Sequence, residues 1–131
     1  MTGERREAMI KIIQEFEGLG LIEEGISPWM SPAFPVKKKD AGKWRLVVDY
    51  RALNSAMIPD SFPLPRIEEI LAQQGQFCIW SVLDMRAGYH QVHLKEECRP
   101  LTSMATPLGP RQWRVVPMGI INGNAIYQRI M

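Results

Sequence analysis

The sequence predicts an α+β fold, in which helices pack on mostly antiparallel strands. Residues recur at helical spacing near both ends of the chain, over 5–17 and 122–131. Between these segments, β-prone runs are joined by turn-forming residues over 34–50 and 100–119. A chain of 131 residues is about one domain long, so these elements are expected to share one core.

The N-terminal helix is predicted from four apolar residues that share one face: Met9, Ile12, Ile13 and Phe16. Thr2 is available as its N-cap, and Gly18 suits its end. Three prolines follow within residues 25–35, and they favour an extended backbone over a helix. A stiff extended segment is therefore expected to lead into the first hairpin.

That hairpin spans residues 34–50, with turn chemistry at 40–42. Residues 35–51 contain six basic residues against two acids, a net charge of +4. Such a local excess of positive charge predicts an anion-binding surface. Taken alone, a lysine-rich turn is more often a solvated part of the surface than a binding site.

A short helix is expected after Pro65, ending near Gly75. Its buried stripe is predicted to be Ile67, Ile70 and Leu71. The next run, 77–84, is apolar on both faces, which is typical of a central strand. Residues 90–94 alternate as a further strand, and a second hairpin is expected to turn at 108–111.

Asp84 closes the apolar run just before a small, turn-prone segment. Burying an unpaired carboxylate costs several kcal/mol, so this residue needs a partner. A strand-terminal carboxylate can hold Mg²⁺, and basic side chains on a nearby hairpin can hold phosphates on that ion. Phosphoryl transfer relies mainly on positioning and charge neutralisation, which these two features would supply.

A zinc site is the alternative suggested by His90, His93 and Cys98. Residues three apart on a strand point to opposite faces, so the two histidines are not expected to converge. Cys78 and Cys98 are expected to be reduced. The chain shows neither a signal peptide nor an apolar run long enough to span a membrane, so we expect an intracellular protein of the cytoplasm or nucleus with no membrane partner.

Four blocks of the sequence resemble reverse transcriptases, most closely those of gypsy-type LTR retrotransposons and retroviruses. In order, they are SPWMSPAFPVKKKDAGKWRLVVDYRALN, PLPRIEEIL, SVLDMRAGYHQVHL and VPMGIINGNAIYQRIM. The resemblance runs from about Glu7 to Met131. It implies a right-hand polymerase, with fingers at 1–58 and 92–117, the first part of the palm at 59–91, and the start of its second part at 118–131.

The resemblance also implies a role for individual residues. Asp84 is the implied catalytic and metal-binding aspartate, for Mg²⁺ or Mn²⁺. The residues implied to bind the deoxynucleoside triphosphate are Lys38, Arg45, Met85, Arg86, Tyr89 and Met118, of which Tyr89 would be the steric gate against a ribose 2′-hydroxyl. Those implied to contact the RNA or DNA template-primer are Trp44, Pro117, Gly119 and Asn122. Asn124 stands where this family usually has proline.

The family's remaining catalytic aspartates lie in a Tyr-x-Asp-Asp hairpin, a sequence absent from these 131 residues. Two-metal nucleotidyl transfer needs carboxylates from separate strands around ions about 4 Å apart. The chain alone is therefore expected to be inactive, and the rest of the palm, with RNase H and integrase domains as further candidates, is an expected partner. The alternative is a non-catalytic retrotransposon remnant that binds nucleic acid.

Overall fold

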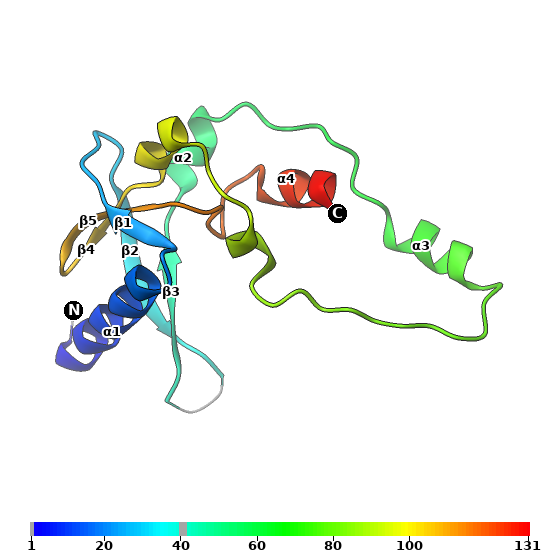
Figure 1. Cartoon of the computed structure of the whole chain (residues 1–131), viewed down its shortest axis with the longest axis horizontal. Coiled ribbons are helices and arrows are strands. Elements are labelled where there is room, and N and C mark those ends of the chain that lie inside the picture. The colour runs from blue at the N-terminus through cyan, green and yellow to red at the C-terminus, as the bar shows by residue number, and fades with distance from the viewer. Residues whose placement is uncertain (1, 40–41) are drawn as a thin grey trace.

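The computed structural model describes residues 2–39 and 42–131. Its sheet has five strands: β1 (Ile22–Glu24), β2 (Ser31–Lys37), β3 (Trp44–Val48), β4 (Met104–Thr106) and β5 (Gly109–Trp113). They lie in the order β1-β5-β4-β2-β3, and every neighbouring pair is antiparallel except β2 with β4. This mixed architecture confirms the α+β prediction, and it places strands far apart in sequence side by side (Figure 1).

Helix α1 (Gly3–Gly18) confirms the predicted N-terminal helix and packs on β1, β2, β3 and β4. Met9 and Ile13 on its apolar face are fully buried, so this face forms the centre of the core. Thr2 occupies the N-cap position, but its side chain makes no capping hydrogen bond. After the helix the chain reverses through Gly20, whose φ of 70° lies in the left-handed region that glycine adopts most easily.

Both predicted hairpins are confirmed. In the first, β2 pairs with β3 from Ala33↔Val48 to Lys37↔Trp44. The predicted turn residues Asp40 and Ala41 lie outside the described residues. The second hairpin joins β4 to β5 and turns at 107–108, slightly earlier than expected, because Gly109 already begins β5.

A short helix, α2 (Arg51–Ala56), and a 3₁₀ helix, η2 (Glu96–Thr102), close the other end of the core. The buried Tyr50 hydroxyl donates a hydrogen bond of 2.9 Å to the Thr102 carbonyl oxygen. Burial raises the pKa of Tyr50 well above its ordinary value. Tyr50 therefore stays a neutral donor and ties the start of α2 to the end of η2.

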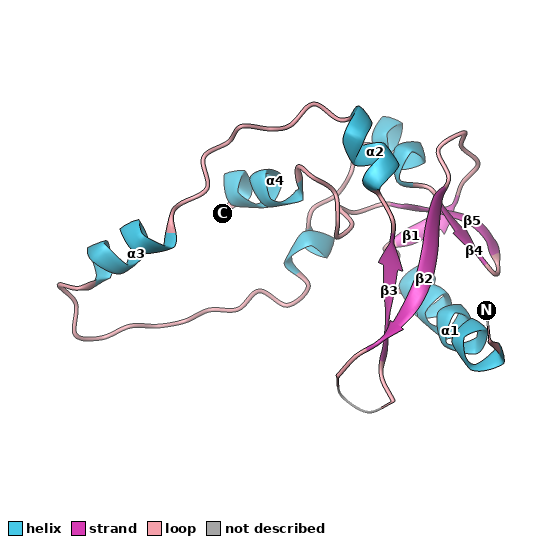
Figure 2. Cartoon of the chain, turned by 180° about the vertical axis from the view of Figure 1, so that it is seen from behind, coloured by secondary structure: helices cyan, strands magenta, loops and turns pink. Residues whose placement is uncertain are grey.

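Helix α3 (Ile67–Gln74) forms where the sequence predicts it, but its predicted buried stripe is wrong. Ile67 is 75% exposed, and Ile70 and Leu71 are exposed as well. The helix lies at the far end of two long connecting segments that project away from the sheet (Figure 2). Its apolar stripe has nothing to pack against among the described residues.

The strand predicted at 77–84 is also wrong, because this segment has an irregular backbone. Val82 is 92% exposed and Leu83 is 91% exposed, and Asp84 is exposed rather than buried. A strand needs a neighbour that accepts and donates its backbone hydrogen bonds. No strand within residues 2–39 and 42–131 lies beside this segment.

The predicted strand at 90–94 is replaced by a 3₁₀ helix, η1 (Gly88–Gln91), and a single bridge between His93 and Val115. The C-terminal helix α4 (Gly123–Ile130) is confirmed. Over the described residues, no helix is both long enough and apolar enough to cross a bilayer.

Candidate nucleotide-binding site

The basic hairpin presents two of its cations on one face. Arg45 pairs with Val36, and the Lys38 backbone N–H donates to the Lys43 carbonyl oxygen at 2.8 Å. Because cross-strand partners share a face and faces alternate along a strand, Lys38 and Arg45 lie on the same face. Both are exposed, and no described carboxylate lies within 4 Å of either cationic group. Their charges are therefore available to an external anion.

Lys37 and Trp44 lie on the opposite face of the hairpin, toward α1. The Lys37 ammonium forms an ion pair with Glu4 at 3.3 Å and lies 5.0 Å from the centroid of the Trp44 ring. One face of the Trp44 indole is thus already used in a cation–π contact. This arrangement favours a packing role for Trp44 over the template contact that the sequence predicts.

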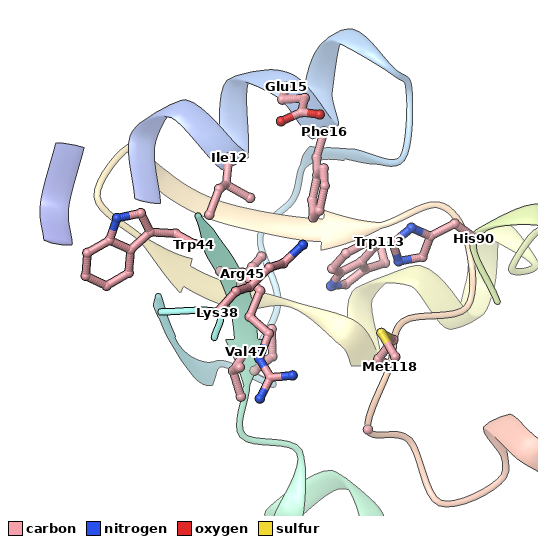
Figure 3. Close-up of a pocket in the computed structure, with 13 residues that line it drawn as sticks. Ile12, Glu15, Phe16, Lys38, Trp44, Arg45, Val47, His90, Trp113 and Met118 are labelled. Atoms are coloured by element: carbon pink, nitrogen blue, oxygen red, sulfur yellow. The ribbon is translucent and has the colours of Figure 1, made fainter. Parts of the chain in front are cut away.

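A pocket of about 400 Å³ opens between α1, β3 and a pair of neighbouring rings (Figure 3). Lys38 and Arg45 line it on the hairpin side, and Met118 and Gly119 line it opposite. The pocket thus combines apolar walls, from α1 and from the ring pair, with the cationic side chains of the hairpin. Such a pocket suits a flat, apolar group that carries negative charge.

His90 and Trp113 form this ring pair, with centroids 5.2 Å apart and the ring planes tilted by 33°. Phe16 contacts both rings, at 5.9 Å from His90 and 5.5 Å from Trp113. Burial against these apolar rings lowers the pKa of His90 below its ordinary value. His90 is therefore a neutral wall of the pocket near pH 7 and adds no positive charge there.

A second pocket, of about 520 Å³, adjoins the first. His90 and Met118 line both pockets. The other residues of the second pocket are Leu83, Asp84, Met85, Ala87, Gly88, Tyr89, Tyr127 and Met131. The fold therefore places the Asp84 carboxylate and the basic hairpin around two neighbouring cavities, although 39 or more residues separate them in sequence.

Tyr89 stands on η1 at the wall of the second pocket. Its hydroxyl donates a hydrogen bond to Asn124 Oδ1, and its ring meets the Tyr127 ring edge to face, with centroids 5.4 Å apart. A Cβ on Gly88 would lie 2.6 Å from the Tyr127 hydroxyl, so only glycine fits beneath that ring. These contacts attach η1 to the first turns of α4.

The loop 117–121 carries Met118, whose side chain is 69% exposed, between a buried Pro117 and Gly119. Gly119 has a φ of 92°, in the left-handed region. Asn54 holds this loop with two hydrogen bonds of 2.9 Å, one from its Nδ2 to the Gly119 carbonyl oxygen and one to its Oδ1 from the Ile121 N–H.

The structure brings eight of the predicted site residues to the two pockets: Lys38, Trp44, Arg45, Asp84, Met85, Tyr89, Met118 and Gly119. Arg86, Pro117 and Asn122 line neither pocket. The Asn122 amide is already used, because it donates to the Ile58 carbonyl oxygen and accepts from the Asp60 N–H, both at 2.9 Å.

Sequence reasoning missed His90 as a pocket wall, as well as Trp113, Tyr127 and Asn54. Each acquires its place through contacts with residues more than 20 positions away. A single sequence carries no local signal for such contacts. Asn124 differs from these four residues, because the sequence itself shows an asparagine where the resemblance implies a proline.

Asp84 is the sole carboxylate among the described residues that line the second pocket. Across residues 2–39 and 42–131, no three His, Cys, Asp or Glu side chains gather as a metal site would require. One carboxylate oxygen donor suits Mg²⁺ chemically, but one such residue does not complete a two-ion centre. The described residues therefore do not by themselves fit the full metal site that a polymerase would need.

Comparison with known proteins gives this geometry a context. Residues 36–131 match the family model described as "Reverse transcriptase (RNA-dependent DNA polymerase)". The chain is 38% identical over 123 residues to "Retrovirus-related Pol polyprotein from transposon 297" of Drosophila melanogaster, an alignment that covers 91% of the chain and 12% of that protein. It is 43% identical over 129 residues to "Enzymatic polyprotein" of Figwort mosaic virus, covering 96% of the chain and 19% of that protein.

The chain thus spans less than a fifth of the length of these two relatives. The family match covers most of the chain, including every residue that lines the second pocket and all those of the basic hairpin from Val36 onward. On these grounds, the chain belongs to the reverse transcriptase (RNA-dependent DNA polymerase) family.

Proposed function

We propose that this chain is the nucleotide-binding portion of a polymerase that extends a primer with deoxynucleotides on an RNA or DNA template, within a longer polyprotein. The observation that carries the proposal is the pair of adjoining pockets that share His90 and Met118. The first supplies Lys38 and Arg45, neither of which is paired with a carboxylate among the described residues, and the second supplies the Asp84 carboxylate and Tyr89. A nucleoside triphosphate carries the complementary groups, namely phosphates, a sugar and a base.

Lys38 and Arg45 bind the triphosphate in this proposal, because both cations share a face and neither is paired with a described carboxylate. Tyr89 lies at the sugar, and its ring excludes a 2′-hydroxyl. Met118 lines both pockets and Gly119 lines the first, where the base and the template strand would meet. Met85 lines the Asp84 side of the site, and the next residue, Arg86, is exposed outside both pockets.

Asp84 contributes one oxygen ligand to a divalent cation, Mg²⁺ or Mn²⁺, whose use is general in this family. Asp84 and the further carboxylates would together hold two such ions, one of which would supply activation of the primer hydroxyl and the other charge neutralisation at the pyrophosphate. The further carboxylates would come from a part of the polyprotein outside these 131 residues. Asp84 is exposed and faces a pocket, so its carboxylate is accessible to such ligands.

The proposed division into fingers and palm has support in the sheet. All five strands come from residues 1–58 and 92–117, the two segments assigned to the fingers. Asp84 and α4 lie in the segments assigned to the palm, 59–91 and 118–131. The long exposed segment around α3 would then be completed by the remainder of the palm, which also explains why its apolar side chains are uncovered.

Primer extension by the polyprotein that contains this chain tests the proposal. Extension of a primer on an RNA template with deoxynucleotides and Mg²⁺ is expected, and Asp84→Asn should abolish it because the amide removes the charge that holds the cation. Glu97→Gln is the matched control, since Glu97 is exposed on η2 and lines neither pocket. Retained activity in Asp84→Asn would refute the catalytic assignment.

A non-catalytic nucleic-acid-binding module is the second candidate, favoured by the unpaired cations of the hairpin. In this case the chain binds a single-stranded oligonucleotide with an affinity that falls steeply as salt rises. Lys38→Ala should lower the slope of log K against log salt by about 0.7, and Lys11→Ala, which removes an exposed charge on α1, should not. Binding that ignores salt would exclude the hairpin as the contact surface.

A further inference from the structure

Tyr89 has a hydrogen-bond partner that the chemistry of the site does not by itself require. The acceptor is Asn124 Oδ1 on the first turn of α4, 35 residues away in sequence. Asn124 is exposed and is not among the residues that line either pocket. Its side chain therefore reaches the Tyr89 hydroxyl from outside the lining of both pockets.

Two contacts position the Tyr89 side chain. Asn124 accepts the hydrogen bond from its hydroxyl, and the Tyr127 ring meets the Tyr89 ring at an interplanar angle of 75°. Gly123 leaves space beside the ring, since a Cβ there would lie 3.8 Å from it. The Tyr127 ring in turn packs closely against Gly88. Of these contacts, only the hydrogen bond is directional at the hydroxyl, the end of the side chain farthest from the backbone.

We propose that Asn124 is a positioning residue that holds the Tyr89 ring against the second pocket and thereby sets the preference for deoxyribonucleotides over ribonucleotides. The inference rests on the proposed function, in which Tyr89 lies at the sugar. A ring excludes a 2′-hydroxyl only while it stays in place, and a ring that swings aside admits it. Proline, expected at this position, has no side-chain acceptor and could not hold the hydroxyl in this way.

The size of the effect follows from the population of the displaced ring. A hydrogen bond of ordinary net strength shifts a two-state rotamer equilibrium by about three- to tenfold. Without Asn124 the displaced ring becomes more populated by about that factor, and ribonucleotide incorporation rises with it. Deoxynucleotides do not need the ring to move, so the change should fall mainly on kcat/KM for ribonucleotides.

The test measures kcat/KM for a deoxynucleotide and for the matching ribonucleotide in the polyprotein. In Asn124→Ala the ratio of the two should fall about three- to tenfold, because ribonucleotide incorporation rises. Asn124→Asp keeps the acceptor oxygen and should retain most of the wild-type ratio. Gln128→Ala, on the same helix and outside both pockets, is the control that should not change it.

Tyr89→Phe removes the hydroxyl and keeps the ring, so it should lower the ratio as Asn124→Ala does, and the double variant should lower it no further. Additive losses, an unchanged ratio in Asn124→Ala, or an equal fall in both kcat/KM values would overturn the proposal. If the wild-type polyprotein extends no primer, the proposed function fails and this inference fails with it. If it extends primers and Asn124→Ala discriminates normally, only the inference fails.

Discussion

Asn54 joins α2 to the loop that carries Met118, and replacing it tests how that loop is held. Its amide makes two hydrogen bonds of 2.9 Å, to Gly119 and from Ile121. Each is worth about 0.5–1.5 kcal/mol net, so their loss together costs about 1–3 kcal/mol. Alanine is more favourable than asparagine in a helix by about 0.5 kcal/mol, which offsets part of that cost. The expected net destabilisation of Asn54→Ala is therefore about 0.5–2.5 kcal/mol.

Urea unfolding followed by tryptophan fluorescence measures this change, because Trp113 is buried in the core and becomes exposed on unfolding. With a slope of about 1–2 kcal/mol per molar urea, the midpoint should fall by about 1 M. Ser55→Ala is the matched control. It lies in the same helix, gains similar helix propensity and loses one exposed bond, from its hydroxyl to the Ala52 carbonyl oxygen.

The result that would refute this reasoning is an Asn54→Ala midpoint equal to that of Ser55→Ala. The Gly119 carbonyl oxygen and the Ile121 N–H would then hydrogen-bond to water without loss of stability, and the loop would not depend on α2 for its position. Asn54→Asp adds a further check near neutral pH. It keeps the acceptor for the Ile121 N–H but places a charged oxygen beside the Gly119 carbonyl oxygen, so it should be at least as destabilising as alanine.

Three further predictions concern the same region. Gly119→Ala should lower the free energy of unfolding, measured in urea, by about 1 kcal/mol. The reason is the φ of 92°, which is strained for alanine, since the nearest atoms leave room for a Cβ. Gly18→Ala, at the end of α1, is the control and should not destabilise the protein. Burial lowers the pKa of His90, so as the pH falls the unfolded chain binds a proton at this residue before the folded chain does. The free energy of unfolding should therefore decrease as the pH drops below about 6.5. His90→Phe should flatten this pH dependence, and an unaltered pH profile in the variant would contradict the reasoning. The Asp49 carboxyl accepts hydrogen bonds from the Arg51 side chain and from the Arg51 backbone N–H, and its pKa measured by NMR should be about 2. In Arg51→Ala this pKa should return toward its ordinary value. An unchanged pKa in the variant would show that the guanidinium does not cause the shift.

Local elements were predictable because their causes are local. The α1 stripe recurs every three or four residues, so its helix and buried face follow from spacing alone, and Met9 and Ile13 are indeed buried. The two hairpins follow from turn residues between β-prone runs. The four family blocks likewise identify Asp84 and the basic hairpin as a pair without any coordinates, since they are patterns of residue type and order.

The segment 77–84 shows the limit of this reasoning. Its composition is that of a central strand, yet it forms none, because a strand exists only with a neighbour and the described chain places none beside it. The stripe of α3 is exposed for the same reason. Apolar composition states what a segment could bury, and tertiary structure decides whether a partner is present.

The sequence by itself determined the family and the α+β class. Only the tertiary structure decided which of the predicted site residues share a cavity. It placed His90 and Met118 between two pockets, used the Asn122 amide in backbone contacts, and set Asn124 beside the Tyr89 hydroxyl. The physical reason is that a side chain's chemistry is fixed by its type, whereas its neighbours are fixed by packing between elements distant in the chain.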